Sequence, residues 1–219
     1  MKILLHSANL GSFDPFVPSV EQELPSNVKL ETYLFTDVNF LPRFRAMTPR
    51  MQARIPKMFC WQLFPDFDYY LWVDASCTLS SRKAVWWFLE QCAGADSAFF
   101  LHPDRKSIRE EYLFLKQQLE KGNKYLERRY AGEFLEEQYQ EIYSDYSYRD
   151  DLLIASTAFI YQNTLSMHRA LKEWWYHTSR FHIIDQLSLP YVLKKSGTHF
   201  NLIKESYLDI SYLKYVRNA

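Results

Sequence analysis

The run from Tyr69 to Val73 constrains the fold more than any other stretch of the chain. Five apolar or aromatic residues, YYLWV, follow one another and are succeeded at once by Asp74. A strand without polar alternation is typical of a mainly parallel sheet that helices cover on both faces. In such open sheets, ligands bind just beyond the carboxyl ends of the strands. The run therefore predicts an α/β fold and makes Asp74 a candidate site residue.

Strand-like and helix-like segments alternate along the rest of the chain, which predicts a mostly parallel central sheet with helices on both faces. The charged segment from 107 to 144 is rich in strong helix formers and predicts an excursion of two helices from that sheet. Strand patterns occupy 2–8, 28–37, 69–73, 97–103, 152–162 and a last short segment, 199–203; helical patterns occupy 48–64, 80–92, 164–178 and 185–197.

Helix boundaries follow from capping residues and prolines. Thr48 is a predicted N-cap of the segment before the Asp74 strand. Pro56 lies inside that segment, so we expect the helix to break and restart near Ile55. Ser80 or Ser81 is expected to cap the next helix.

Composition narrows the class of protein. With 219 residues and 47% hydrophobic residues, the chain can bury a large core, and we expect a single domain over 1–219. The formal net charge is +0, from 26 basic and 26 acidic residues, so bulk electrostatics does not favour nucleic acid or an anionic bilayer. No apolar window approaches the length of a membrane span or signal peptide.

The three cysteines are odd in number and lack the CxxC spacing of zinc sites or the pattern of a disulfide framework. This usage favours a reducing compartment, and the expected location is cytoplasmic. The chain has 5 glycines and neither GxGxxG nor GxxxxGK[ST], so another device must hold any nucleotide phosphates. Arg54 and Lys57 are candidates to offset diphosphate charge; the alternative is a solvated helix face.

Three blocks of the chain together carry a family resemblance. They are RIPKMFCWQLFPDFDYYLWVDASCTL, FFLHPDRKSIREEY and LKEWWYHTSRFHIIDQLSLPYVLKKSG, in that order, and the similarity covers roughly residues 50 to 200. The sequence resembles the glycosyltransferase-like family first catalogued as a domain of unknown function in plant, bacterial and large-virus proteins. That family is assigned to the GT-A fold of nucleotide-sugar glycosyltransferases. The resemblance implies a GT-A-like domain with a donor half at about 1–105 and an acceptor half, with C-terminal closure of the metal and donor site, at about 106–219.

The resemblance also implies a metal site. In GT-A enzymes an Asp-x-Asp motif after a central strand holds a divalent metal on the donor diphosphate, and the matching element here is Asp74-Ala75-Ser76. Mn²⁺ or Mg²⁺ is the implied cofactor, with Asp74 and Ser76 as ligands and Ala75 beside the donor. His199 stands where many GT-A enzymes bring a C-terminal histidine onto the metal; the alternative is a surface histidine at a strand start.

The nucleoside pocket and the donor are implied in the same way. Asp37 ends the second strand where GT-A enzymes place a residue against the uracil ring, and Ser7 and Ala8 would line the same pocket. A carboxylate accepts hydrogen bonds, which suits the N–H of uracil, so a UDP-sugar is the expected donor. The alternative for Asp37 is an Asx turn.

The transfer reaction needs a carboxylate near the acceptor hydroxyl. Asp185 matches an Asp-Gln block of the family, and its apolar neighbours suggest burial and a raised pKa; a helix N-cap is the alternative. Asp150 and Asp151 precede a strand, and because adjacent side chains point to opposite faces, we choose Asp151 as the second candidate base.

A third group of polar residues follows another strand end. His102, Asp104 and Arg105 are expected either to bind sugar hydroxyls or to form a local ion-pair network.

The predicted function is metal-dependent transfer of a sugar from a nucleotide diphosphate sugar, expected to be UDP-linked, to a hydroxyl of a glycan or glycoside. The alternatives are a non-catalytic carbohydrate- or partner-binding domain and, less favoured because no phosphate loop occurs, a nucleotidyltransferase. Inversion and retention both stay open, and the chain is compatible with being a module of a longer protein.

Overall fold

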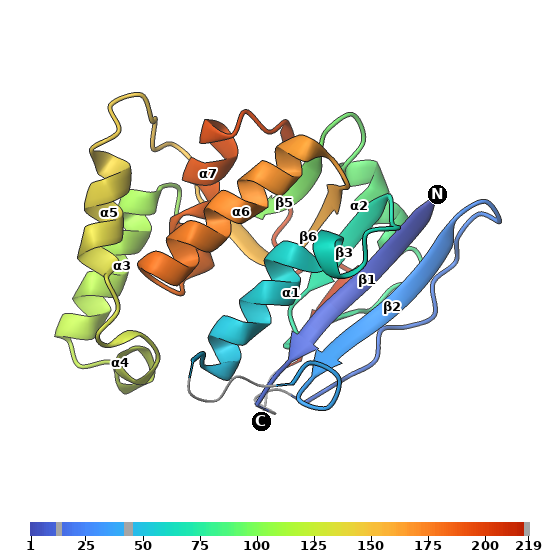
Figure 1. The fold of residues 1–219 in the computed structure, drawn as a ribbon, viewed down its shortest axis with the longest axis horizontal. Helices are drawn as coiled ribbons and strands as arrows, with labels where there is room; N and C mark the ends of the chain where they lie inside the picture. Colours follow the sequence, from blue (N-terminus) through green and yellow to red (C-terminus); the bar gives the residue numbers. More distant parts are fainter. Residues whose placement is uncertain (12–14, 42–45, 217–219) are drawn as a thin grey trace.

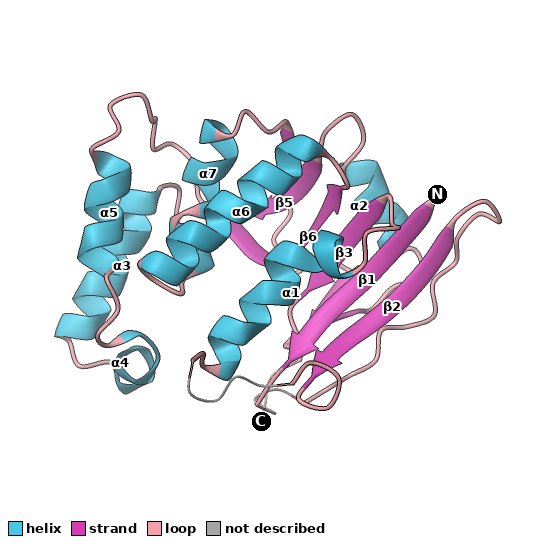
Figure 2. Ribbon diagram, in the orientation of Figure 1, coloured by secondary structure: helices cyan, strands magenta, loops and turns pink. Residues whose placement is uncertain are grey.

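The computed structural model describes residues 1–11, 15–41 and 46–216. Within them, six strands form one sheet in the order β2-β1-β3-β6-β5-β7, and two short strands form a second sheet (Figures 1 and 2). The main sheet contains β1 (Lys2–Asn9), β2 (Lys29–Thr36), β3 (Tyr69–Val73), β5 (Ser97–Leu101), β6 (Ile154–Gln162) and β7 (Phe200–Ile203), and the second contains β4 (Cys77–Leu79) and β8 (Leu213–Tyr215).

The main sheet is mostly parallel, as the sequence predicts. Strand β1 pairs in parallel with β2 and β3, and β5 pairs in parallel with β7. Strand β6 lies between β3 and β5 and is antiparallel to both. Because its direction is reversed, β6 begins at the edge where β3 and β5 end, with Ile154 opposite Leu101. Residues before β6 therefore lie at the same sheet edge as Asp74.

Helices cover both faces of the sheet. Helices α1, α6 and α7 pack on one face, and α2 with the small sheet packs on the other. Helices α3, α4 and α5 stand beside the sheet (Figure 1). The bounds are α1 Pro49–Leu63, α2 Ala84–Gln91, α3 Ile108–Glu120, α4 Lys124–Tyr130, α5 Leu135–Tyr143, α6 Leu165–Arg180, the 3₁₀ turn η1 Asp185–Leu187, and α7 Leu189–Lys195.

The excursion between β5 and β6 contains three helices rather than the two expected. Gly122 and Gly132 separate them with φ angles of 70° and 84°. Residues with a side chain adopt such positive φ angles at a steric cost, so each glycine permits a chain reversal that ends one helix.

Strand β3 is covered on both faces, as its apolar run predicts. Tyr70 and Trp72 belong to the core under α1 and α6, whereas Leu71 and Val73 belong to the core under α2. All four are at most 3% exposed. Burying a large apolar side chain contributes about 1.5–3 kcal/mol, so the run fixes β3 at the centre of the fold and fixes where Asp74 emerges.

Two predicted helix boundaries need correction. The Thr48 cap is confirmed, since its Oγ1 accepts a hydrogen bond from Met51 N at 3.2 Å. However, α1 does not restart near Ile55; it continues past the buried Pro56, and the non-helical residue is Phe59, with φ −123° and ψ 19°. Packing of this helix against the sheet outweighs the lost proline hydrogen bond.

Helix α2 begins later than the sequence predicts. Its N-cap is Lys83, which makes no side-chain cap bond. The Ser81 hydroxyl instead accepts a hydrogen bond from the backbone N of Lys83 at 3.3 Å, so neither Ser80 nor Ser81 caps the helix.

The three cysteines are buried and unpaired with one another. None of the helices in the described residues combines the length and apolar character that a bilayer-spanning helix needs.

The expectation that 199–203 forms the last strand is wrong, because β8 follows it and pairs with β4.

Candidate functional site

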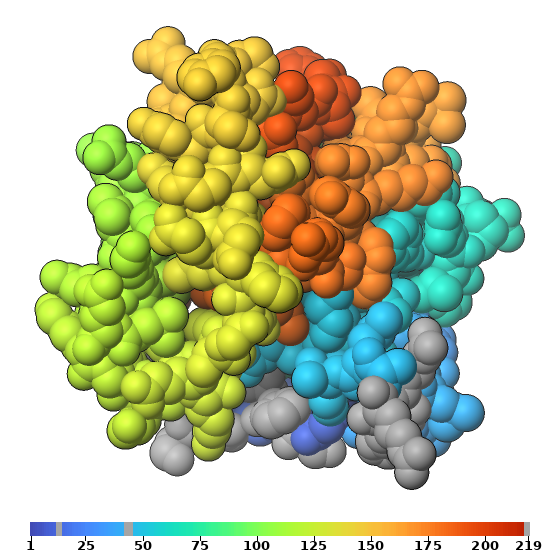
Figure 3. Space-filling model, turned by 60° about the vertical axis from the view of Figure 1, so that its left-hand side comes forward, coloured from blue at the N-terminus to red at the C-terminus, as the bar shows by residue number. Residues whose placement is uncertain are grey.

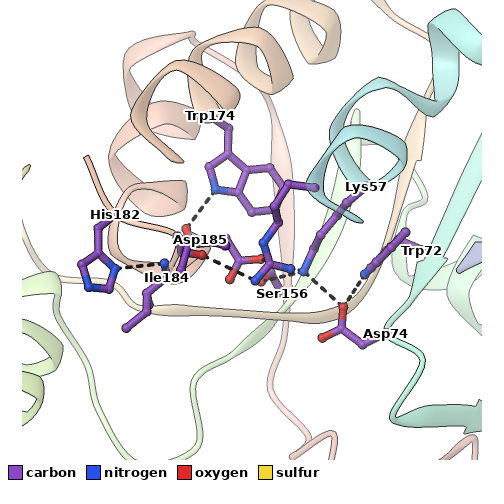
Figure 4. A network of polar contacts seen from close by, with 10 residues as sticks. Lys57, Trp72, Asp74, Ser156, Trp174, His182, Ile184 and Asp185 are labelled. Atoms are coloured by element: carbon purple, nitrogen blue, oxygen red, sulfur yellow. Dashed lines mark hydrogen bonds and ion pairs between the residues drawn. The ribbon is translucent and has the colours of Figure 1, made fainter. Parts of the chain in front are cut away.

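Asp74 emerges at the carboxyl end of β3, and two donors orient its carboxylate (Figure 4). Oδ1 accepts hydrogen bonds from Trp72 Nε1 at 2.7 Å and from Lys57 Nζ at 3.3 Å. The backbone is fixed as well, since the carbonyl oxygen of Asp74 accepts from Cys77 N at 2.8 Å in a tight turn. The side chain is 31% exposed, and no contact of its Oδ2 is present in the part of the chain that the structure describes.

Lys57 on α1 connects Asp74 to the interior. Its ammonium group donates to Asp74 Oδ1 at 3.3 Å, to Ser156 Oγ at 3.2 Å and to Asp185 Oδ2 at 2.7 Å. Its side chain is 1% exposed, and Nζ lies 5.4 Å from the Trp72 ring centroid. All three ammonium hydrogens are therefore used inside the protein, and Lys57 does not lie on a solvated helix face.

Asp185 is the second anion of this network. Its Oδ2 also lies 3.3 Å from Arg54 Nη1, and its backbone oxygen accepts from Trp174 Nε1 at 2.9 Å. Burial by itself raises the pKa of Asp185, but the charges of Arg54 and Lys57 outweigh burial and hold it at about 2. The expected raised pKa is wrong because the sequence does not show the ion pairs. Asp185 is a carboxylate at neutral pH.

A second chain of contacts supports the turn that carries Asp185. The buried Glu111 on α3 forms an ion pair with Arg105 and accepts a hydrogen bond from Gln186 Nε2 at 2.5 Å. His102 Nδ1 accepts from the backbone N of Asp104 and of Arg105 at 3.2 and 3.1 Å. His102 and Arg105 thus belong to a local network of contacts, and the binding of sugar hydroxyls by His102, Asp104 and Arg105 stays a prediction.

Asp37 directly follows β2, and its side chain contacts the segment that follows β1. Its Oδ2 accepts a hydrogen bond from Gly11 N at 2.9 Å, which spans 26 residues and is no Asx turn. Its Oδ1 is buried and has no partner among the described residues. Ser7 and Ala8 lie on the neighbouring strand β1, but successive strand side chains point to opposite faces, and Ala8 points into the core under α1. Only one of the two side chains can line a common pocket.

His199 lies at the opposite edge of the sheet from Asp74. Its backbone oxygen accepts from Asp96 N at 2.8 Å, immediately before β5 begins. The five-residue β3 separates the two edges, a distance of roughly 16 Å. The expectation that His199 and Asp74 share a metal is therefore corrected: the last residues before a parallel strand lie at its amino end, whereas Asp74 lies at a carboxyl end.

The segment that reaches Asp74-Ala75-Ser76 instead is the one after β8. The carbonyl oxygen of Ser76 accepts a hydrogen bond from Val216 N at 2.6 Å. Ala75 is 9% exposed, and Ser76 is half-buried. Strand β8 has only three residues, which is too short to show the alternation of apolar and polar residues that predicts a strand.

Asp151 stands apart from the Lys57 network. It forms ion pairs with Lys194 and Arg149, and its side chain is 45% exposed. The contacts of Asp151 lie on α7 and the loop before β6, so the structure does not bring the two candidate bases, Asp151 and Asp185, together.

The groups around Asp74 fit a cation only if the substrate supplies ligands too. The described residues contain no cluster of three or more histidine, cysteine or carboxylate side chains suited to a metal. Asp74 Oδ2 and the Ser76 hydroxyl remain as protein oxygens, because Trp72 and Lys57 occupy Asp74 Oδ1. Mg²⁺-type ions bind through one or two carboxylates together with substrate phosphates and water, and this donor set matches that pattern.

Two hollows in the described residues lie away from this network. One, with a volume of about 490 Å³, lies beside α2 and is lined by Trp86, Trp87 and Tyr212, among others. Trp87 belongs to the core on the α2 face of the sheet, whereas Lys57 and Asp185 lie on the α1 face. The polar network is the candidate site because it contains converging charges at a strand end.

The sequence matches a known protein family over most of its length. The model of the TOD1/MUCI70 glycosyltransferase-like domain matches residues 42–217, well over half of the chain. The chain belongs to this family. This glycosyltransferase-like domain thus has a mixed α/β fold with the Lys57 network at the carboxyl edge of its sheet.

Among solved structures, the domain is similar to a glycosyltransferase involved in the glycosylation of the major capsid of PBCV-1. The TM-score is 0.46 and the sequence identity 8%, over 92% of this chain and 81% of that chain. A search of the curated proteins gave no match.

Proposed function

We propose that this domain transfers a sugar from a nucleotide diphosphate sugar, specifically a UDP-sugar, to a hydroxyl of a glycan or glycoside. The observation that carries the proposal is the geometry of Asp74: one carboxylate oxygen is fixed by Trp72 and Lys57, and the side chain remains 31% exposed at the carboxyl edge of the sheet. Membership of a glycosyltransferase-like family supports the reaction class.

The uridine moiety is assigned to the ends of β1 and β2. Asp37 Oδ1 is buried without a partner, and buried acceptors are normally satisfied in proteins. The N–H of a uracil ring would satisfy it, whereas the acceptor N1 and the exocyclic amine of adenine match a lone carboxylate oxygen less well. The bond from Gly11 N to Oδ2 orients the free oxygen.

A divalent cation, Mn²⁺ or Mg²⁺, would be held by Asp74 and the Ser76 hydroxyl together with the donor diphosphate. When bound, it would supply positive charge that stabilises the departing nucleoside diphosphate. The role of Lys57 is to orient Asp74, because its ammonium hydrogens are all engaged within the protein.

Asp185 is assigned a positioning role rather than that of the catalytic base. A carboxylate with a pKa of about 2 is a weak base, and its charge already stabilises Arg54 and Lys57. Arg54 is 17% exposed at the side chain, with Nη1 3.3 Å from Asp185 Oδ2 and Nη2 donating to the backbone oxygen of Ile183 at 3.5 Å, so its charge lies beside the proposed diphosphate site.

A nucleotide panel tests the donor assignment. We expect calorimetry to show binding of UDP, with ADP at least about tenfold weaker. We also expect Asp37→Asn to weaken UDP binding by about tenfold, because one carboxylate hydrogen bond is replaced by a poorer one. Asp151→Asn is the matched control, since its ion pairs lie on α7, and it should bind UDP like the wild type.

Equal affinity for UDP and ADP would contradict the uridine site. Absence of binding to every nucleotide and UDP-sugar would contradict sugar transfer from a nucleotide donor and favour a non-catalytic carbohydrate-binding domain.

A further inference from the structure

Three arginines from two helices converge beside the Lys57 network. Arg50 and Arg54 lie one turn apart on α1, and Arg129 lies on α4. The guanidinium carbons of Arg50 and Arg129 lie 5.8 and 5.7 Å from the ring centroid of Tyr130. In Figure 3 the yellow-green α4 and the blue α1 lie near each other on the face toward the viewer. Segments that are distant in sequence thus place two positive charges beside one tyrosine, with Arg54 one helical turn away from Arg50.

These guanidinium groups have more donors than partners. In the described part of the chain, Arg50 and Arg129 have no carboxylate within salt-bridge distance. The Nε atoms of Arg54 and Arg129 are buried and unsatisfied there. Glu133 is the nearby carboxylate; its Oε2 accepts from the backbone N of Ile183 at 2.7 Å, and among the described residues it forms no salt bridge with Arg50 or Arg129. Buried donors without acceptors are rare, and a bound group explains them.

The electrostatics of the cluster is consistent with a missing anion. Burial lowers the pKa of Arg50, and the charges of Arg129 and Arg54 lower it further, which outweighs the opposite effect of Tyr130 and Glu133. Like charges that approach one another in a partly buried site are destabilising unless an anion lies between them. A planar guanidinium binds carboxylate, phosphate and sulfate groups through paired hydrogen bonds.

We propose that Arg50, Arg54 and Arg129 bind an acidic group of the acceptor sugar, a carboxylate, phosphate or sulfate, so that the enzyme selects acidic acceptors. This inference rests on the proposed function. Along α1, Arg50 lies seven residues before Lys57, which corresponds to about 10 Å at 1.5 Å per residue. Lys57 contacts Asp74, where the donor diphosphate is proposed to bind. The arginine cluster therefore lies about two sugar rings from the proposed diphosphate position, on the side of the helical excursion.

Binding of small acidic sugars tests this site. We expect NMR titration with glucuronate and glucose 6-phosphate to show affinities about tenfold higher than with glucose, which is the neutral control. Arg50→Gln and Arg129→Gln should each remove most of that preference. Arg128→Gln is the matched control, because Arg128 is the exposed neighbour of Arg129 on the same helix, and it should keep the preference.

A second arm distinguishes acceptor from donor. With UDP at saturation, the acidic sugars should still bind, because the two ligands occupy different parts of the site. Displacement of the acidic sugars by UDP would contradict the acceptor assignment and show that the arginines bind the donor diphosphate. Equal binding of glucose and the acidic sugars, or an equal loss in Arg128→Gln, would contradict a specific anion site. UDP binding by each variant shows that it is folded, so failure here is separable from failure of the donor assignment.

Discussion

Lys57→Met is expected to lower the free energy of unfolding by about 3–5 kcal/mol. The substitution keeps the length of the side chain but removes the charge that compensates two carboxylates, Asp74 and Asp185, the second of them 9% exposed at the side chain. Breaking a buried ion pair by removing one partner leaves an uncompensated buried charge, and such changes cost this much in other proteins. Asp185 keeps its ion pair with Arg54 at 3.3 Å, so we expect a loss in the lower part of this range of unfolding free energies.

Urea unfolding of wild type and variant measures the effect, and the chain contains a matched control. Lys194 also forms an ion pair with an aspartate, Asp151, but the two side chains are 29% and 45% exposed. Lys194→Met should therefore cost less than about 1 kcal/mol. If the two lysine variants were equally stable, the buried network would not be the stabilising element described here.

Lowering the pH from 7.5 to 5 is expected to destabilise the fold by on the order of 2 kcal/mol for each of three buried histidines. Burial lowers the pKa of His6 to about 3 and those of His177 and His182 to about 4. The unfolded chain binds protons below its ordinary pKa of 6.5, whereas the folded chain does not bind them until about pH 4 or 3. Stability is therefore complete above pH 6.5 and falls as the pH drops through the window from 6.5 to about 4.

His6 allows the cleanest test of this pH dependence. It is fully buried between the rings of Tyr70 and Trp72, and both of its ring nitrogens lack partners in the described residues. His6→Leu should reduce the stability difference between pH 7.5 and pH 5, measured by urea unfolding, by about 2 kcal/mol. The exposed His199→Gln serves as control and should leave the difference unchanged. An unchanged difference in His6→Leu would show that His6 is not the neutral buried group described.

The fold was predictable where local pattern and burial agree. The apolar run of β3, the Thr48 cap and the helical propensity from 107 to 144 each depend on residues close in sequence, and the predicted elements are present. The exceptions are α1, which continues past Pro56 and is kinked at Phe59, and the short β8. Both depend on tertiary packing, which outweighs a local proline signal or stabilises a strand too short to recognise.

The site was less predictable because its contacts are distant in sequence. Strand-end position alone indicated Asp74, but the partners of Lys57 are 17, 99 and 128 residues away. For the same reason the sequence suggested a raised pKa for Asp185, and the family resemblance suggested His199 as a ligand of the expected metal. Trp72, Ser156 and Trp174 complete the network, and nothing in their local sequence distinguishes them from core or helix residues.

The most direct test of the central claim is a calorimetric titration of UDP into wild type and Asp74→Asn, each with and without Mn²⁺. We expect Mn²⁺ to strengthen UDP binding to the wild type by about tenfold or more, and Asp74→Asn to lose this gain while keeping the weaker metal-free binding. If Mn²⁺ strengthened UDP binding equally in the two proteins, the assignment of Asp74 as the residue that holds the cation against the donor diphosphate would be contradicted.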